Sequence, residues 1–206
     1  HIIRRAYPMS RYPDAHFIKS ANAAKQFTPD TGREAAFAGR SNAGKSSAIN
    51  VIVNRRQFAR TSRTPGRTQL INFFALADGL RLVDLPGYGF ARVSNAMRDH
   101  WRELMADYFE SRQSLAGLFL IMDIRRGITP FDEQMLAFAD QVSLPTHVLL
   151  TKADKLKRGQ ASRSLLEVKK ALEGKATVQQ FSALTRQGEE EARRKLDEFM
   201  TLTDGS

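Results

Sequence analysis

Hydrophobic residues along this chain fall into short apolar runs that alternate with longer stretches of helical spacing. The short runs are typical of buried strands and cover 34–38, 68–75, 80–84, 115–122, 146–150 and 177–181. The longer stretches, with apolar residues three or four positions apart, predict helices over 47–59, 94–112, 158–173 and 186–202, and another that begins at 130. Because strands and helices alternate, the pattern indicates an α/β sandwich with a mostly parallel sheet.

Turn and capping residues support several of these boundaries. Asp78-Gly79 is a hairpin dipeptide, so the strands on either side of it are expected to pair antiparallel. Ser94 and Thr129 can cap the helices that follow them, and Pro130 suits a first helical position. We therefore expect a three-layer fold around a six-stranded sheet, mostly parallel, with one antiparallel hairpin.

The first 33 residues contain three prolines and show little periodicity. We expect 1–33 to be an irregular extension packed on one domain that covers 34–206, because 206 residues with 42% hydrophobic content suffice for one substantial core. The longest apolar stretch, 115–122, is far shorter than the roughly 18 residues that a membrane span needs. The chain has no cysteine, which excludes disulfides and thiolate metal sites and suits the cytoplasm.

Positive charge exceeds negative charge by 32 − 22 = +10, which favours a polyanionic partner, either nucleic acid or an anionic membrane surface. One cluster has no acidic residue and contains Arg55, Arg56, Arg60, Arg63 and Arg67. A second contains Lys155, Lys157, Arg158, Arg163, Lys169, Lys170 and Lys175. In the second cluster Glu167 and Glu173 supply counter-charges, so a solvated helix face stays open as an alternative there.

A phosphate-binding loop is the clearest chemical signal. The pattern G-x-x-x-x-G-K-[ST] is matched by Gly39, Arg40, Ser41, Asn42, Ala43, Gly44, Lys45 and Ser46, and Ser47 begins the next helical stretch. The glycines allow successive N–H groups to converge on phosphate oxygens, and the helix N-terminus adds its positive end. Lys45 can then reach the β and γ phosphates, and the Ser46 hydroxyl can ligate Mg²⁺.

Two later segments add to this loop. Asp84-Leu85-Pro86-Gly87 ends a predicted strand, so the Asp84 carboxylate can hold Mg²⁺ through water and the Gly87 amide can meet a γ-phosphate. D-x-x-G alone is a weak signal, but it follows the phosphate loop in the expected order. We expect Lys45 and Gly87 to take part in catalysis.

The last segments select the base. Thr151-Lys152-Ala153-Asp154 ends a predicted strand, where the Asp154 carboxylate can accept two hydrogen bonds from guanine while the stem of Lys152 covers the base. Adenine lacks that pair of donors, so the site would leave buried polar groups unpaired with the wrong base. Ser182-Ala183 follows the last strand and can offer a backbone N–H to the guanine oxygen. All these segments lie at the carboxyl ends of strands, where α/β sheets bind ligands.

With these segments in view, the chain resembles the translation-factor-related GTPases and, within them, the EngB family (also called YihA) of bacterial ribosome-assembly GTPases. The resemblance covers nearly the whole chain and is strongest at 39–47, 64–69, 84–89, 151–155 and 181–183. It implies the P-loop GTPase fold, or G domain, with Mg²⁺ and GTP or GDP as ligands. It also implies that Thr68, preceded by Gly66 and Arg67, is a catalytic switch residue that ligates Mg²⁺; a threonine of the hairpin strand stays open as the alternative.

The resemblance further implies a biological role. A GTP-hydrolysing switch of this family would act in assembly of the large ribosomal subunit, with ribosomal RNA as its polyanionic partner, and would support growth, cell division and septation in a bacterium. It would be a cytoplasmic monomer. The residues themselves show only a basic GTPase.

Two residues depart from the best-known small GTPases. Thr151 stands where N-K-x-D has Asn, which removes an amide that braces the phosphate loop. Tyr88 follows D-x-x-G where a water-orienting Gln is expected, so we predict slow hydrolysis by the protein alone. Some GTPases that lack this Gln, which this chain resembles, place an amide oxygen for K⁺ at the position of Asn42, although an Asn that only braces the loop is an equal alternative.

Three rival functions remain at this stage. A nucleotide-regulated RNA-binding scaffold would hold GTP or GDP with negligible turnover. An ATP-using P-loop kinase or ATPase is disfavoured by the segments at 151–154 and 182–183, which fit guanine. A membrane-transport G domain is disfavoured by the absence of an apolar span.

Overall fold

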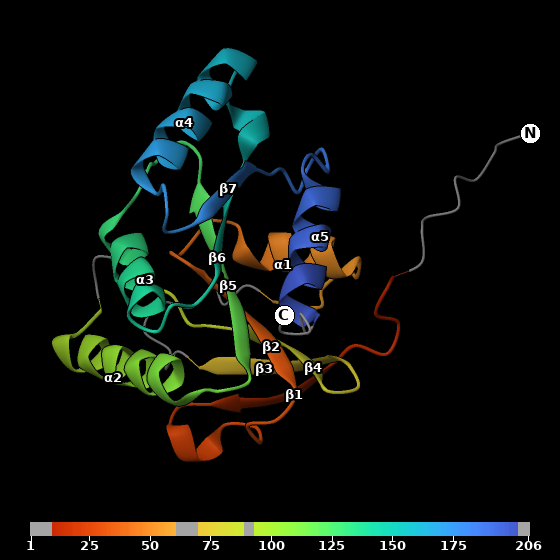
Figure 1. Cartoon of the computed structure of the whole chain (residues 1–206), viewed down its shortest axis with the longest axis vertical. Coiled ribbons are helices and arrows are strands. Elements are labelled where there is room, and N and C mark those ends of the chain that lie inside the picture. Colours follow the sequence, from red (N-terminus) through yellow and green to blue (C-terminus); the bar gives the residue numbers. More distant parts are fainter. Residues whose placement is uncertain (1–9, 61–69, 89–92, 202–206) are drawn as a thin grey trace, which may run out of the picture.

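The computed structural model describes residues 10–60, 70–88 and 93–201, which form a three-layer α/β sandwich (Figure 1). Within these residues seven strands make one sheet in the order β1-β3-β4-β2-β5-β6-β7. The strands are β1 (His16–Ala21), β2 (Arg33–Gly39), β3 (Ile71–Ala77), β4 (Leu80–Asp84), β5 (Leu115–Asp123), β6 (Thr146–Thr151) and β7 (Thr177–Gln180). The helices are α1 (Lys45–Val53), α2 (Asn95–Ser111), α3 (Pro130–Gln141), α4 (Arg158–Ala171) and α5 (Glu189–Met200), with short 3₁₀ turns η1 (Ala24–Gln26) and η2 (Ala153–Lys155).

The sheet separates two hydrophobic cores. Along β2, Ala35 and Phe37 face the core shared with α1 and α5, while Ala36 and Ala38 face the core shared with α2, α3 and α4. Successive residues of a strand point to opposite faces, so a strand covered on both sides must be apolar throughout. This explains why the central strands read as continuous apolar runs.

The strand pairing confirms the mostly parallel sheet and the hairpin. β4, β2, β5, β6 and β7 pair in parallel, and β3 pairs antiparallel with β4 through the turn at Asp78-Gly79. The expected count of six strands was wrong, because β1 pairs antiparallel with β3 at the sheet edge. β1 lies in the segment that we expected to be irregular. Its residues are mostly exposed, so the strand is held by backbone pairing. Its sequence therefore lacks the alternation of hydrophobic and polar residues that would predict a strand.

Helix termini follow local chemistry. The Ser94 side chain accepts a hydrogen bond from the N–H of Met97, and Thr129 forms a capping box with Asp132, as the sequence predicts for these caps. α1 begins at Lys45 and ends at Val53, six residues before the expected end at 59, because Asn54 takes a left-handed conformation. No helix in the described part of the chain is long and apolar enough to span a membrane.

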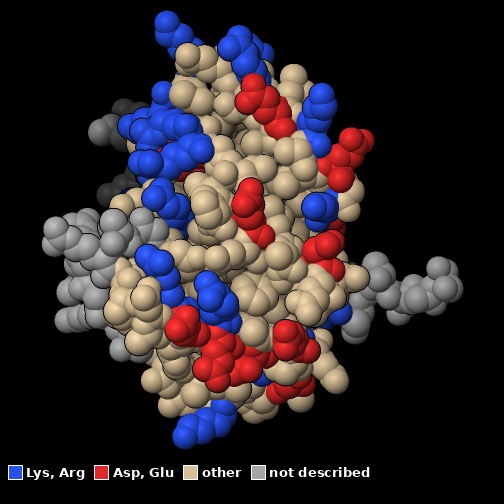
Figure 2. All heavy atoms as spheres, turned by 90° about the vertical axis from the view of Figure 1, so that its left-hand side faces the viewer, with Lys and Arg blue, Asp and Glu red and all other residues tan. Residues whose placement is uncertain are grey.

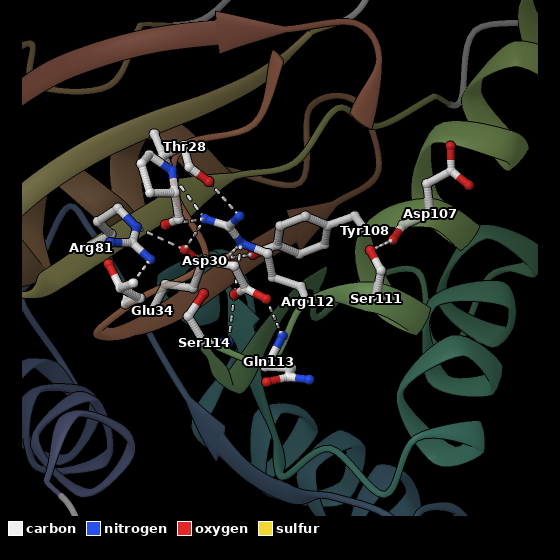
Figure 3. Close-up of polar contacts among 12 residues, drawn as sticks. Thr28, Asp30, Glu34, Arg81, Asp107, Tyr108, Ser111, Arg112, Gln113 and Ser114 are labelled. Carbon is white, nitrogen blue, oxygen red and sulfur yellow. Dashed lines mark hydrogen bonds and ion pairs between the residues drawn. The ribbon is translucent and has the colours of Figure 1, made fainter. Parts of the chain in front are cut away.

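A buried ionic network fastens α2 and the segment before β2 to the sheet (Figure 3). Glu34, which is fully buried at the start of β2, accepts hydrogen bonds from Arg81 Nε at 2.8 Å, Arg112 Nε at 2.7 Å and Tyr108 Oη at 2.9 Å. Arg112 also donates to the carbonyl and hydroxyl oxygens of Thr28, at 2.6 and 2.7 Å. The network lies at the opposite end of β2 from Gly39, so it supports the fold at a distance from the phosphate loop.

Candidate functional site

The phosphate loop leaves β2 at Gly39 and turns tightly into α1. Asn42 and Gly44 both take left-handed conformations, with φ of 66° and 91°, and the N–H of Ala43 donates to the Arg40 carbonyl at 3.0 Å. Glycine adopts such a conformation at little cost, and Asn tolerates it better than most residues. The loop is therefore shaped by its own sequence before any packing is considered.

Gly87 lies directly against the start of this loop. A Cβ atom on Gly87 would lie 2.0 Å from the carbonyl oxygen of Gly39, which is closer than any side chain tolerates. The segment is held there because the N–H of Leu85 donates to the Phe37 carbonyl of β2 at 2.9 Å. The two motifs expected to face the phosphates are thus in backbone contact.

Lys45 and Asp84 form an ion pair between the phosphate loop and the end of β4. Lys45 Nζ lies 2.5 Å from Asp84 Oδ1 and also donates to the Leu85 carbonyl oxygen. Asp84 is buried, and apart from this ion pair its Oδ1 atom has no hydrogen-bond partner among the described residues. Ser46 stands in the first turn of α1, next to Lys45. A hydroxyl and a carboxylate are hard oxygen ligands, so these residues fit Mg²⁺.

No group of three His, Cys, Asp or Glu residues that could hold a metal occurs in the described chain. A magnesium ion here would therefore depend on phosphate oxygens and water for its remaining ligands, as is usual for Mg²⁺ in nucleotide sites.

The guanine segment braces the phosphate loop. Thr151 Oγ1 donates to the Ala43 carbonyl oxygen and lies 3.1 Å from the carbonyl oxygen of Met122, while Lys152 Nζ donates to the Asn42 carbonyl at 2.6 Å. The amide that Asn supplies in other GTPases is absent, as the sequence shows, but the hydroxyl of Thr151 still braces the loop. The threonine hydroxyl reaches the loop because β6 ends beside it.

The residues predicted to read the base meet at the ends of β6 and β7. Asp154 Oδ1 accepts a hydrogen bond from Ser182 Oγ at 2.7 Å, which orients the carboxylate. The Ser182 N–H donates to the Gln187 carbonyl at 3.0 Å, so it is engaged within the protein. The next backbone donor along the chain is the N–H of Ala183, which has no hydrogen-bond partner among the described residues. Of the predicted pair, Ala183 therefore carries the free amide.

Tyr88 is directed toward α3. Its hydroxyl donates to Gln134 Oε1 at 2.7 Å, and its ring packs edge-on against Trp101 and Phe131, with centroid distances of 4.7 and 5.4 Å. Trp101 is buried, and its indole N–H donates to the Pro86 carbonyl at 2.6 Å. This hydrogen bond joins α2 to the segment after β4. The spacing of apolar residues along α2 does not predict it.

Sequence reasoning also missed a buried carboxylate at the end of β5. Asp123 accepts three hydrogen bonds from Arg125 and lies 3.5 Å from Lys152 Nζ. Burial raises the pKa of Asp123, but the hydrogen bonds and charge of Arg125 outweigh it and hold the pKa below its usual value. Its position after a buried parallel strand is the signal that could have found it.

Comparison with known proteins agrees with this geometry. A family model described as "50S ribosome-binding GTPase" matches residues 34–152, more than half of the chain. The protein named "Probable GTP-binding protein EngB" in Escherichia coli (strain K12) is 49% identical over 193 residues, 92% of each chain, and that of Shigella boydii serotype 18 matches equally.

The chain belongs to the EngB family of GTPases. A crystal structure of an EngB GTP-binding protein superposes with a TM-score of 0.65 at 22% identity, covering 81% of this chain and 98% of that one. Era of Aquifex aeolicus bound to GDP and AlF₄⁻ gives a TM-score of 0.63 at 19% identity over 85% of this chain and 58% of that one. These two likenesses show the fold. As an EngB-family protein, the chain binds and hydrolyses GTP.

Some predicted site residues of this EngB-family chain lie outside the described residues, namely Gly66, Arg67 and Thr68, together with Arg63 of the basic cluster. Within that cluster, Arg55 donates to the Ala15 carbonyl oxygen and its guanidinium lies 5.5 Å from the Phe58 ring centroid. Arg55 therefore has partners inside the protein although the cluster contains no acidic residue, because the N-terminal segment returns to α1. Arg56 and Arg60 are exposed.

Proposed function

We propose that this GTPase is a nucleotide-controlled switch in assembly of the large ribosomal subunit, and that it thereby supports bacterial growth, cell division and septation. The observation that carries the proposal is the match over residues 34–152 to a family described as 50S ribosome-binding GTPases. The net charge of +10 suits a partner rich in phosphate. We expect a cytoplasmic monomer.

A basic surface on and around α4 supports a ribosomal RNA contact. Its seven cations are exposed and form no ion pair within the described residues; they are Lys155, Lys157, Arg158, Arg163, Lys169, Lys170 and Lys175. Glu167 and Glu173, the counter-charges of the solvated-face alternative, also pair with none of them. Figure 2 shows basic side chains around α4 at the top of this face and acidic ones gathered over α2 near the bottom. These positive charges would be able to bind the phosphate backbone of RNA.

At the nucleotide site we assign roles to the predicted residues. Ser46, Asp84 and Thr68 would hold Mg²⁺, which when bound neutralises charge on the β and γ phosphates. Lys45 would bind those phosphates from the loop, and the Gly87 amide would meet the γ-phosphate from the opposite side. Because Tyr88 is directed toward Gln134, it offers no group to orient water, and we expect slow hydrolysis without the ribosomal partner.

At the base, Asp154 would accept from guanine, Lys152 would cover the ring with its stem, and the Ala183 amide would donate to the guanine oxygen. The Ser182 hydroxyl holds the Asp154 carboxylate in one orientation at 2.7 Å. A carboxylate that is already oriented rejects a base without the matching donors more strongly than a mobile one.

We further propose that Asn42 supplies a side-chain oxygen to K⁺ near the phosphates. Its backbone carbonyl accepts from Lys152, whereas its side-chain amide makes no hydrogen bond in the described chain, so the loop-bracing alternative gains no support from that amide. Hydrolysis measured with 50S subunits should then be faster in K⁺ than in Na⁺ at equal ionic strength, and Asn42→Ala should remove the difference while GDP still binds. Equal rates in the two salts would contradict this role.

The ribosomal role is tested by co-sedimentation with purified 50S subunits in GDP and in a non-hydrolysable GTP analogue. Binding should depend on the nucleotide. A variant with Arg158, Arg163 and Lys170 changed to Ala should bind 50S subunits more weakly. The slope of the logarithm of its binding constant against the logarithm of salt concentration should flatten by roughly 0.7–0.9 per lost phosphate contact. A matched variant changes three exposed cations elsewhere, Lys19, Lys25 and Arg98, and should bind as the parent does. Absence of 50S binding in both nucleotides would reject the ribosomal role.

The scaffold alternative differs in turnover. It predicts the same negligible GTP hydrolysis with and without 50S subunits, whereas a switch completed by the ribosome predicts acceleration. Single-turnover hydrolysis under both conditions decides between them.

A further inference from the structure

Asp132, a buried carboxylate at the start of α3, caps the helix with one oxygen and leaves the other without a hydrogen-bond partner in the described chain. Asp132 is 2% exposed, and its Oδ2 atom accepts hydrogen bonds from the N–H and the hydroxyl of Thr129, both at 2.8 Å. These bonds complete the capping box of the helix. Oδ1 of the same carboxylate is buried and has no hydrogen-bond partner in the described chain. A cap alone does not require that oxygen.

Asp132 lines a small hollow, with a volume of about 10 Å³, between α3 and the phosphate loop. The other walls come from the loop itself, the end of β5 and the turn that follows it; they are Arg40, Ser41, Asn42, Ala43, Ile121, Met122, Asp123, Arg126, Gly127 and Thr129. A carboxylate is costly to bury unless a positive group or hydrogen-bond donors face it. A group that offsets the negative charge of Asp132 should therefore lie in the hollow or in its wall.

Arg40 of the phosphate loop fits that role. Burial raises the pKa of Asp132 above its usual value; hydrogen bonds from Thr129 and the positive charge of Arg40 act in the opposite direction and offset only part of the rise. Asp123, the other carboxylate at the hollow, is already held by Arg125 and Lys152. Arg40 is thus the cation of the loop whose charge acts on Asp132.

The same turn of α3 also contacts the segment after β4. Phe131 packs on the ring of Tyr88, and Gln134 accepts a hydrogen bond from the Tyr88 hydroxyl. Arg40 is close to that segment as well, because a Cβ atom on Gly87 would lie 3.7 Å from the Arg40 Cα atom. One turn of α3 therefore borders both segments that meet the phosphates of the nucleotide.

We propose that Asp132 is a positioning residue of the GTP site, whose carboxylate attracts the Arg40 guanidinium and so fixes the phosphate loop against α3. The inference rests on the GTPase activity of the family and is independent of any ribosomal partner. It assigns to Asp132 a second role beside helix capping: Oδ2 holds the helix start, and the negative charge of the carboxylate acts on Arg40 of the loop.

The test is a double-mutant cycle on nucleotide affinity. Asp132→Asn keeps an oxygen for the cap and removes the charge, Arg40→Gln removes the partner, and both are combined in a third protein. Each single variant should bind GDP and GTP about three- to tenfold more weakly. The double variant should bind within about twofold of Arg40→Gln alone, since residues that act as one unit are not additive. Asp140→Asn removes an exposed charge from the end of the same helix and should bind as the parent does.

A purely structural role for Asp132 gives a different pattern. The two single effects would then multiply in the double variant, and Asp132→Asn would lower the melting temperature without any dependence on Arg40. That outcome, or parental nucleotide affinity in Asp132→Asn, would overturn the proposal. If Asp132→Asn does not fold, Arg40→Gln and Arg40→Lys still decide, because the charge-preserving lysine should retain affinity that glutamine loses.

Discussion

The Thr151 hydroxyl donates a hydrogen bond to the carbonyl oxygen of Ala43, and so joins the base-reading end of the site to the phosphate loop. The same hydroxyl lies 3.1 Å from the Met122 carbonyl oxygen of β5. One buried side chain therefore links the ends of β5 and β6 to the loop after β2. Because the loop and the base pocket share this contact, a change at one is expected to affect the other.

Replacement of Thr151 by Val should weaken GDP and GTP binding by about five- to tenfold, because it removes a buried hydrogen bond and keeps the shape of the side chain. Thr151→Ser preserves the hydroxyl and should bind nearly as the parent does. Equilibrium titration with a fluorescent guanine nucleotide measures both. Parental affinity in Thr151→Val would show that the loop does not need this brace.

Asp154→Asn should weaken GTP binding and improve binding of xanthosine triphosphate, because an amide presents a donor where guanine also donates and xanthine accepts. The Ser182 hydroxyl orients Asp154 through a hydrogen bond of 2.7 Å, so a variant at Ser182 offers a milder change at the same site. Ser182→Ala should weaken GTP binding less than Asp154→Asn does and should not favour xanthine. Competition titrations with the two nucleotides test the assignment, which unchanged GTP affinity in Asp154→Asn would reject.

Gly87→Ala should displace the segment after β4, because the new methyl group would lie 2.0 Å from the Gly39 carbonyl oxygen. We expect a strong loss of binding to a non-hydrolysable GTP analogue and a smaller loss for GDP. Gly159→Ala is a suitable control, since a Cβ atom there meets nothing within 4 Å. Equal affinity of Gly87→Ala and the parent for the analogue would mean that the segment adapts without cost.

Glu34→Gln should destabilise the fold by about 3–5 kcal/mol, because the buried guanidinium of Arg81 would lose its counter-charge and that of Arg112 would keep only Asp30, at 3.7 Å. Denaturant unfolding measures the free energy directly. The nucleotide affinity of the folded variant should be close to parental, since the network lies at the other end of β2 (Figure 3). Glu110→Gln, an exposed change on α2, should leave stability within about 0.5 kcal/mol.

His147 should make stability depend on pH. Burial lowers its pKa to about 4, and the neutral ring accepts a hydrogen bond from Thr177 and donates one to Gln179. The unfolded chain, with a pKa near 6.5, therefore binds this proton first, so stability should fall as pH falls from about 6.5 to about 4, by at most about 1.4 kcal/mol per unit. Lys195 lowers the pKa and Glu198 raises it, both weakly compared with burial.

The check is the difference between the parent and His147→Gln in thermal unfolding across that pH range. Other titrating groups are common to both proteins and cancel. A parent whose extra stability does not shrink below pH 6.5 would show that this histidine titrates normally.

The sequence by itself determined the parts of the molecule that depend on neighbours in the chain. The phosphate loop needs left-handed residues at Asn42 and Gly44, the hairpin needs Asp78-Gly79, and the α3 cap needs Thr129. Apolar runs located the buried strands because both faces of those strands are covered. Since the motifs stand at strand ends and parallel strands align their carboxyl ends, the sequence also predicts that these motifs lie together, as they do in the structure.

Only the tertiary structure decided the relationships between distant residues. β1 is held at the sheet edge by backbone bonds to β3, which carry no side-chain signature. Thr151 braces Ala43 across 108 positions, and Arg112 reaches Glu34 across 78. The local sequence identifies Asp132 only as a helix-capping residue. The structure adds that its second oxygen is buried without a hydrogen-bond partner, and that Asp132 lines a hollow beside the phosphate loop. Such contacts form when the chain closes on itself, because hydrogen bonds and buried charges depend on distances in space that sequence spacing does not encode.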